Sequence, residues 1–384
     1  MQEASRDAYA MTLTIQAVRS PRGLKTFVKL PHRVLRDCPQ WVPSLFRDEL
    51  TTFSPDRNPF YEDAETRLFL AFRDKRPVGR IAAILSHAAN RKYGTQNVRF
   101  GWFDAMEDYD AAKGLFRAAA DWGRSVGMKS LTGPHGFSNL DPQGMLIDGF
   151  EHRGTIHAPY NPPYYPEYAE RYGFTKDIDY VEMRARTPQS GVDPRYLKIR
   201  ERLEKSTRVR LVRLESRKHI RRLSREIFSL LGETYDSIYG VVPLSERQVD
   251  YVTRKFLSII DLKLVNVAVD EKDRVIGVLI TMPSLSHAFQ KARGRLLPWG
   301  WLHITRGMKK SPVLDFLLIG VKASYQRSGL PILLLIDLAE RALALGYRSS
   351  ESAPMLEDNL MVQSLHKYFD AEIHKRRRVF RLEL

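Results

Sequence analysis

Two segments, far apart in the chain, have the pattern of paired β-strands. In each, two runs rich in aliphatic and β-branched residues flank a short charged turn. The first pair of strands is expected at 67–73 and 78–85, around a turn at 74–77, and the second at 263–269 and 274–281, around a turn at 270–273. The pattern therefore predicts two β-hairpins.

A repeat connects the two hairpins. Gly79 and Gly277 occupy matching places in the second strands, and an asparagine follows each after 82 positions, at Asn161 and Asn359. Apolar residues at helical spacing follow both hairpins and end at a glycine: Leu115, Ala119, Trp122 and Val126 before Gly127, then Ile332, Leu335, Ile336, Ala339 and Leu343 before Gly346. The chain is therefore predicted to hold two copies of one fold, offset by 198 residues.

Each copy also opens with a short strand and an amphipathic helix, at 12–18 and 24–35 in the first copy and at 208–214 and 220–230 in the second. Strands that alternate with helices around one sheet indicate an α/β or α+β fold class. Turn-forming residues without an apolar period mark a linker. We expect a flexible lead at 1–10, an N-terminal domain at 11–186, a linker at 187–205 and a C-terminal domain at 206–384.

Composition restricts the class of protein. The 384 residues include a single cysteine, Cys38, which excludes an intramolecular disulfide framework and a multi-cysteine zinc site. The ten histidines lack ligand spacing with carboxylates, so no metal site is expected. The N-terminus has no apolar core of signal-peptide length, and the most apolar run, 329–338, is far shorter than the ~20 residues that span a bilayer. A cytoplasmic protein is expected, and its net charge of +16 favours a polyanionic partner: nucleic acid, an anionic membrane or a phosphate-rich ligand.

The segment with the clearest chemistry joins an apolar strand at 313–321 to a strongly apolar helix. The turn between them carries Gln326, Arg327 and Gly329. Backbone N–H groups at the start of a helix are unpaired, and the positive end of the helix dipole lies behind them, so such a turn binds phosphate. A glycine also lets the backbone approach the ligand closely.

Gln326-x-x-Gly329-x-Pro331 resembles the Q/R-x-x-G-x-G/A pyrophosphate loop of the GCN5-related N-acetyltransferase (GNAT) superfamily. The resemblance implies that this loop holds acyl-CoA as a co-substrate. The last position departs from the motif, because proline has no N–H to donate, although proline is tolerated in the first helical turn. The residues that the resemblance assigns to acyl-CoA are Val321, Gln326, Arg327, Ser328, Gly329 and Leu330.

Further strings extend the resemblance over nearly the whole chain. They lie at 58–61 (NPFY), 77–84 (PVGRIAAI), 133–134 (GP), 148–150 (DGF), 160–165 (YNPPYY) and 356–359 (LEDN). Together they are similar to bacterial tandem GNAT proteins, a family that includes bacterial ceramide synthases. The resemblance implies an α+β fold (an α/β sandwich) of two tandem GNAT-like domains, each with a mixed, mostly antiparallel sheet flanked by helices. It also implies transfer of a long acyl chain from acyl-CoA to the amine of a sphingoid base, a step of sphingolipid biosynthesis.

Such a reaction needs a group that takes a proton from the amine and a group that gives one to the leaving thiolate. The candidate bases are Glu351, Glu357 and Asp358 in the second copy and His135 and His157 in the first, with His157 and Glu357 the main ones. In GNAT proteins a tyrosine on a late helix often protonates the sulfur. Tyr368 follows Asn359 by nine positions, later than the family spacing, so it is either this acid or a packing residue. Asn359 is expected to make a structural or CoA-side hydrogen bond.

An aromatic and proline-rich string at 160–165 is expected to form either a shaped pocket wall or a rigid turn packed on the core. Tyr160, Asn161, Tyr164 and Tyr165 are therefore candidates for substrate binding. Because the phosphate-binding loop lies in the second copy, acyl-CoA is assigned to that copy and the acceptor amine to the first.

A further segment, 287–303, is inserted where a plain GNAT domain needs only a turn. Trp299 and Trp301 lie in it among lysines and arginines, which is typical of an interfacial membrane segment. A hydrophobic lid or a contact between domains explains the pattern equally well. Either would serve a lipid amine, so the two tryptophans are substrate-binding candidates, and the inner face of the cytoplasmic membrane is an expected peripheral location. The basic run at 375–378 either adds attraction to anionic lipid, or its alternate residues form the solvated face of a last strand.

Two other functions stay open. A FemX-like transferase shares the tandem fold but takes its acyl group from aminoacyl-tRNA, which the charge of +16 suits. The loop at Gln326 suits CoA instead, so nucleic acid is not the favoured partner. A catalytically inactive lipid- or CoA-binding protein would explain Pro331 as the trace of a lost cofactor site.

Overall fold

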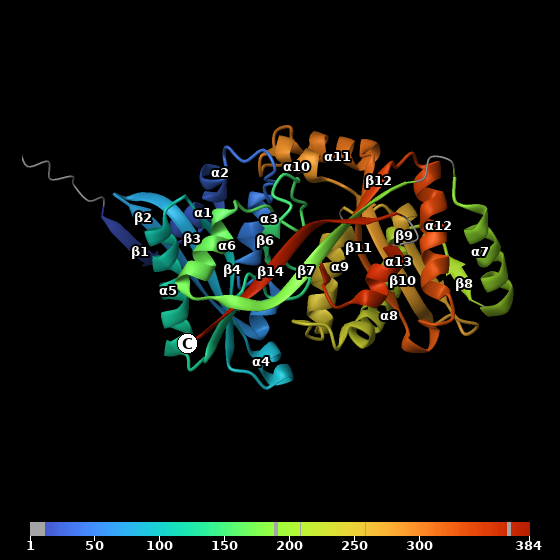
Figure 1. The fold of residues 1–384 in the computed structure, drawn as a ribbon, viewed down its shortest axis with the longest axis horizontal. Coiled ribbons are helices and arrows are strands. Elements are labelled where there is room, and N and C mark those ends of the chain that lie inside the picture. The colour runs from blue at the N-terminus through green and yellow to red at the C-terminus, as the bar shows by residue number, and fades with distance from the viewer. Residues whose placement is uncertain (1–11, 188–190, 208, 258, 367–369) are drawn as a thin grey trace, which may run out of the picture.

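The computed structural model describes residues 12–187, 191–207, 209–257, 259–366 and 370–384. The expected flexible lead at 1–10 and the candidate acid Tyr368 lie outside these ranges. Within them, fourteen strands form one continuous, mostly antiparallel sheet, and helices cover both of its faces (Figure 1). The fold class is therefore α+β, as the resemblance implied.

The elements of the first half are, in chain order, β1 (Leu13–Ala17), α1 (Pro21–Lys29), α2 (Pro31–Val34), α3 (Phe46–Thr52), η1 (Pro59–Glu62), β2 (Ala64–Arg73), β3 (Arg76–Ser86), α4 (His87–Tyr93), β4 (Asn97–Ala105), α5 (Tyr109–Ser125), β5 (Ser130–Gly133), β6 (Met145–Asp148), α6 (Tyr164–Tyr172) and β7 (Thr175–Arg186). Those of the second half are α7 (Pro194–Thr207), β8 (Arg210–Val212), α8 (Arg217–Tyr235), α9 (Glu246–Leu257), η2 (Leu262–Leu264), β9 (Val265–Val269), β10 (Val275–Pro283), α10 (Ser286–Ala292), α11 (Gly300–Lys310), β11 (Val313–Val321), η3 (Ala323–Tyr325), α12 (Leu330–Ala344), β12 (Ser349–Ser352), β13 (Met355–Leu356), α13 (Leu360–His366) and β14 (Glu372–Glu383).

Both predicted hairpins are confirmed, as β2–β3 and β9–β10. Asp74 and Lys75 take positive φ angles of 44° and 69° in the first turn, which is the geometry of a two-residue hairpin loop. The single helix expected at 24–35 is wrong: α1 and α2 are separate helices, because Pro31 has no N–H with which to continue the first. A helix, α7, also occupies much of the expected linker.

The order of strands in the sheet is β1-β2-β3-β4-β5-β14-β7-β12-β11-β10-β9-β8. The first five strands of each half therefore follow one another from the outer edge of the sheet toward its centre in matching order, which agrees with the predicted duplication. At the centre, β14 pairs with β5 of the first half and β7 pairs with β12 of the second, and the two strands pair with each other. Each half thus completes the sheet of the other, and strands β7 and β14 lie in the middle of the molecule (Figure 1).

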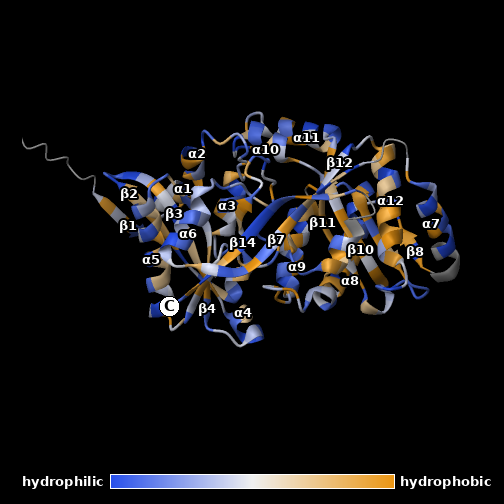
Figure 2. Ribbon diagram, viewed as in Figure 1, coloured by the Kyte–Doolittle hydropathy of each residue, from blue (hydrophilic) through white to orange (hydrophobic). Residues whose placement is uncertain are grey.

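Helices pack on both faces of each half along the apolar stripes that periodicity predicts. In the first half, α5 buries Leu115 and α1 buries Phe27 on opposite faces. In the second half, α12 buries Leu334 on one face and α8 buries Ile227 on the other. Helix α12 is hydrophobic along much of its length (Figure 2), and most of its residues are buried.

The matched glycines of the repeat have one physical role. A Cβ added at Gly79 would lie 2.7 Å from the Leu115 side chain of α5, and one at Gly277 would lie 3.2 Å from the Leu330 side chain of α12. Both positions lack a side chain so that the following helix can approach the sheet closely.

Candidate active site

The two parallel strands of the second half separate part-way along their length. β11 pairs with β12 from Val313 to Phe316, and beyond that point it has β10 on one side and an open edge on the other. Leu317 is the extra residue of a bulge against β10, because the neighbours on either side of it, Phe316 and Leu318, pair with consecutive residues of β10. The opening between 317–321 of β11 and 353–356 is called the C-terminal wedge below.

Side-chain hydrogen bonds show which backbone groups of β11 face this wedge. The Tyr235 hydroxyl donates to the Ile319 carbonyl at 2.8 Å, and the Gln326 amide donates to the Val321 carbonyl at 3.2 Å. In an antiparallel ladder the N–H and C=O of one residue point to the same side. The N–H groups of Ile319 and Val321 therefore also point into the wedge, where an extended ligand would pair with β11.

The predicted phosphate-binding loop lies at the end of the wedge and has the predicted strand–turn–helix form. Gly329 caps α12 with a φ of 86°, a left-handed conformation that a side chain disfavours. The Leu330 side chain belongs to the core and is 1% exposed, so only its backbone belongs to the loop. Arg327 is exposed and adds positive charge to the positive end of the helix dipole.

The corresponding wedge of the first half is filled by tyrosine side chains. β4 pairs with β5 only from Asn97 to Arg99. At the end of β4, the Tyr165 hydroxyl accepts from the Ala105 N–H at 2.9 Å, and the Tyr164 hydroxyl donates to the Ala105 carbonyl at 3.1 Å. The two tyrosines thus occupy both the N–H and the C=O of Ala105, whereas at the matching Val321 of the second half a side chain, that of Gln326, bonds only the carbonyl.

The turn after β4 also differs in charge from the loop after β11. Asp108 is the N-cap of α5 and pairs with Arg73 at 2.8 Å. A carboxylate at this helix start repels phosphate, whereas the matching position in the second half carries Gly329. Both differences favour the second half as the site of a phosphate-bearing ligand.

Asn161 and Tyr160, the other candidates of the aromatic string at 160–165, lie beside the first-half wedge. Asn161 is a buried clamp, because its Oδ1 accepts from the Leu146 N–H at 2.7 Å and its Nδ2 donates to the Leu146 carbonyl at 3.1 Å. Tyr160 lines a cavity of about 110 Å³ beside the buried ion pair of Arg80 with Asp104. A role of this string in substrate binding stays a prediction.

An apolar cavity of about 220 Å³ adjoins the C-terminal wedge. Strand β11 and helices α8 and α9 supply most of its apolar wall: Phe228, Leu231, Val252, Phe256, Ile260, Ile280, Leu317, Leu318 and Ile319. Both halves supply its polar lining: Asn139, Asp141, Gln143, His157, Tyr180, Tyr235, Tyr239, Ser352 and Asn359. This composition suits a ligand with an apolar chain and a polar end.

Three fully buried charged side chains lie where β7 and β14 cross the centre of the sheet. Glu182 of β7 pairs with Lys375 at 2.8 Å and with Arg377, both on β14. Burial alone would raise the pKa of Glu182, but the positive charges of Arg377 and Lys375 lower it to about 2. The interpretation that the whole basic run at 375–378 attracts anionic lipid is therefore wrong for Lys375 and Arg377, which point into the protein. Arg376 and Arg378 are only partly buried, which agrees with the alternative that alternate residues of the run form the more solvated face of the last strand.

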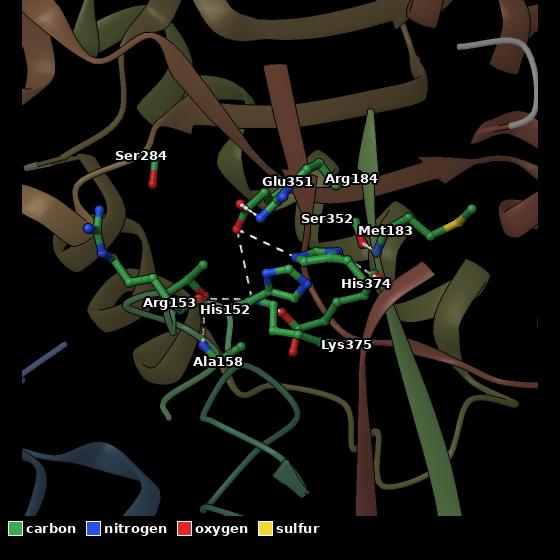
Figure 3. Close-up of polar contacts among 12 residues, drawn as sticks. His152, Arg153, Ala158, Met183, Arg184, Ser284, Glu351, Ser352, His374 and Lys375 are labelled. Carbon is green, nitrogen blue, oxygen red and sulfur yellow. Dashed lines mark hydrogen bonds and ion pairs between the residues drawn. The ribbon is translucent and has the colours of Figure 1, made fainter. Parts of the chain in front are cut away.

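Glu351 of β12 extends this group toward the second half. Its Oε1 accepts from Arg184 at 3.2 Å, and its Oε2 lies 3.8 Å from both His374 Nε2 and Lys375 Nζ (Figure 3). Burial opposes ionisation, but the nearby His374 and the positive charges of Lys375 and Arg184 lower the pKa of Glu351 to about 2. Glu351 therefore carries a negative charge at neutral pH.

His157 and Asp315 lie near this charged group, and their buried polar atoms have no hydrogen-bond partner among the described residues. Both ring nitrogens of His157 and both carboxylate oxygens of Asp315 are unpartnered. Burial lowers the pKa of His157 to about 4, although Glu182 and Glu351 act in the opposite direction. Burial raises the pKa of Asp315 to about 7, even though the Ser284 hydroxyl lies close enough to lower it. Unpartnered polar atoms beside a cavity are groups that a bound substrate can satisfy.

The structure brings together two of the four catalytic candidates. His157 and Asn359 both line the larger cavity, and Asn359 also caps α13, because its Oδ1 accepts from the Val362 N–H at 3.3 Å. Glu357 is not part of that lining and forms an ion pair with Lys176. The fourth candidate, Tyr368, is outside the described residues.

Asp315 and Glu182 are the main groups that sequence reasoning missed. Asp315 is the one charged residue in the apolar strand 313–321, and a lone acid in a buried strand is a signal of function. Glu182 gave no such signal, because its partner Arg377 is 195 positions away.

The remaining candidates, Trp299 and Trp301, are exposed on the segment that joins α10 to α11 and continues into it, so they are not core residues. No helix in the described ranges is both long and apolar enough to cross a bilayer. In the same ranges, His, Cys, Asp and Glu side chains do not gather in threes as a metal ion would require.

Comparisons with known proteins agree with this geometry. No family model matches the sequence. The chain is 27% identical to the bacterial ceramide synthase of Caulobacter vibrioides (strain NA1000 / CB15N), over 97% of this chain and 98% of that protein. It is 24% identical to protein YghO of Escherichia coli (strain K12), over 96% of this chain and 95% of that protein.

Solved structures match over the full length as well. A tandem GNAT protein from the clavulanic acid biosynthesis pathway matches with a TM-score of 0.57 and 13% identity, over 97% of this chain and 98% of that one. A GCN5-related N-acetyltransferase from Sphaerobacter thermophilus matches with a TM-score of 0.50 and 10% identity, over 97% and 95%. The chain therefore has a tandem GNAT fold and is similar over nearly its whole length to a bacterial ceramide synthase, as its motifs predicted.

Proposed function

We propose that this chain is an acyl-CoA-dependent N-acyltransferase that joins a long acyl chain to the amine of a sphingoid base. The observation that carries the proposal is the C-terminal wedge, where an open strand edge, a helix start capped by glycine and an apolar cavity meet. Similarity to a ceramide synthase supports the choice of acceptor.

Each part of the donor has a matching feature in this wedge. The pyrophosphate suits the backbone and positive dipole at the start of α12, next to Arg327. The amide groups of the pantetheine arm suit the N–H and C=O groups of β11 that point into the wedge at Ile319 and Val321. The acyl chain suits the apolar cavity that the same strand lines.

Acyl transfer forms a C–N bond at the thioester carbonyl carbon and breaks its C–S bond. The amine loses a proton, and the thiolate of CoA gains one. We assign the first proton to His157, which lines the cavity and is neutral at pH 7 because its pKa is about 4. The negative charges of Glu182 and Glu351 favour the imidazolium as it forms, whereas burial and the positive charges of Lys375 and Arg377 oppose it. Asn359, on the same cavity, stays a candidate for a hydrogen bond to the donor, and Tyr368 stays a candidate for the second proton transfer.

Replacing His157 by Gln should lower kcat about 10²-fold, the lower end of the usual contribution of a general base. The Kd for acyl-CoA should stay the same, because the base contacts the amine and not the phosphates. Steady-state kinetics and calorimetry on the same preparation measure the two effects. Unchanged kcat, or an equal loss of acyl-CoA binding, would remove His157 from this role.

Filling the cavity should change the chain-length preference. Leu318→Trp places a larger side chain in the cavity wall. Excluding two methylenes of the acyl chain, at ~0.8 kcal/mol each, lowers kcat/KM for palmitoyl-CoA about tenfold and leaves acetyl-CoA turnover within about twofold. Leu345→Trp, at an exposed leucine outside the cavity lining, is the matched control. Equal losses for both donors would place the acyl chain elsewhere.

A further inference from the structure

The helical hairpin of α10 and α11 carries an exposed apolar patch. It is inserted between β10 and β11 and lies along one edge of the molecule, above both halves (Figure 1). Leu297, Trp299, Trp301 and Leu302 are 76%, 67%, 49% and 40% exposed. These four side chains are called the tryptophan patch. Four large apolar side chains together on a surface indicate a binding site.

The opposite face of the hairpin is firmly packed. A Cβ added at Gly307 of α11 would lie 2.8 Å from Ala288 of α10, so the two helices are in close contact. Gln290 donates to the carbonyls of Pro39 and Trp41 of the first half, at 2.7 and 2.9 Å. Because the inner face is already bound to both halves, the tryptophan patch is a separate, outward surface.

The same hairpin is strongly cationic. From 286 to 310 the sequence contains no Asp or Glu. Its exposed basic residues are Lys291, Arg293, Arg295, Arg306, Lys309 and Lys310, and none of them forms an ion pair with another described residue. Exposed aromatic side chains surrounded by unpaired cations match the headgroup and upper acyl region of an anionic bilayer. A second copy of the chain would bring the same positive charge to the patch and would be repelled.

We infer that the tryptophan patch docks this protein on an anionic phospholipid bilayer. The docking does not depend on the proposed function. Leu317 lines the cavity and packs beneath the hairpin, so docking brings the C-terminal wedge near the bilayer. A long-chain amine dissolves in that bilayer, so docking would give the enzyme access to its acceptor. This consequence for the reaction rests on the proposed function.

Co-sedimentation with vesicles tests the inference. Wild type should bind vesicles that contain phosphatidylglycerol and phosphatidylcholine, should bind pure phosphatidylcholine at least tenfold more weakly, and should release at high salt. Trp299→Ser with Trp301→Ser should weaken binding to the anionic vesicles at least tenfold, and so should Arg306→Glu with Lys309→Glu. The control, Arg221→Glu with Arg222→Glu on α8, makes the same change in net charge elsewhere and should bind within about twofold of wild type. All variants should keep the wild-type melting temperature.

Equal binding by the tryptophan variant and the control would overturn the inference. So would a concentration-dependent dimer of the wild type that the tryptophan variant loses, because a second copy would then cover the patch. A changed acyl-chain preference with unchanged vesicle binding would make the segment a lid and would also overturn it. Acyl transfer to a water-soluble amine, measured without vesicles, reports on the proposed function separately.

Discussion

Gly329→Glu should abolish measurable acyl-CoA binding without unfolding the protein. Gly329 caps α12 at the end of the C-terminal wedge, so the new carboxylate would lie where the pyrophosphate is proposed to bind. Loss of two charge-assisted hydrogen bonds at about 2 kcal/mol each weakens binding about 10³-fold. Isothermal titration calorimetry with CoA measures this effect directly.

Gly329→Gln is the matched control for that variant. Both substitutions force a side chain into the left-handed conformation that Gly329 adopts, at a cost of about 1–2 kcal/mol, and both add similar bulk. They differ in charge. We expect CoA to bind the Gln variant at least tenfold more tightly than the Glu variant. Equal affinities would show that no phosphate lies at this helix start.

Glu182→Gln should destabilise the protein by about 3–5 kcal/mol, because it leaves the buried charges of Lys375 and Arg377 without their counterion. These side chains belong to the two central strands, so the loss weakens the junction between the halves. Urea unfolding followed by fluorescence and circular dichroism measures the change in the free energy of unfolding.

The same pair predicts a pH dependence. The pKa of Glu182 is about 2 in the folded protein and 4.5 ordinarily, so its contribution to stability is complete above about pH 5 and is lost as the pH falls toward 2. The Gln variant should lose less stability than wild type over this range. Glu383→Gln is the control: its partner Arg381 is on the same strand and both are exposed, so the loss should stay below about 1 kcal/mol. Similar losses for both variants would contradict the assignment of Glu182 as a buried anchor.

Elements set by local pattern could be predicted from the sequence. Both hairpins follow from aliphatic and β-branched runs on either side of a short charged turn, and the matched Gly79 and Gly277 mark where a helix lies against the sheet. The apolar period predicts one helix at 24–35 and does not show the break between α1 and α2, although Pro31 is a local signal for such a break. The exchange of β7 and β14 could not be predicted, because strands so distant in the sequence pair through tertiary contacts that no local period encodes.

The candidate site also has parts that the sequence predicts and parts that only the tertiary structure shows. The loop at Gln326–Gly329 is a local motif, so the sequence located it. Residues 375–378 are all basic, so the sequence does not show that Lys375 and Arg377 are buried while Arg376 and Arg378 are partly exposed. This difference arises because β14 is a central strand with neighbours on both edges. The difference between the wedges, with Tyr165 filling one and the other open, depends on side-chain contacts that a single sequence does not show.

The most direct test of the account is the product formed from palmitoyl-CoA and a panel of long-chain amines, analysed by mass spectrometry with free CoA measured in parallel. The account predicts an N-palmitoyl amide of a sphingoid base in equal amount to the CoA released, a strong decrease in the His157→Gln variant and no product from the Gly329→Glu variant. Absence of any amide from wild type across the panel, or amide formation that survives in the Gly329→Glu variant, would contradict it.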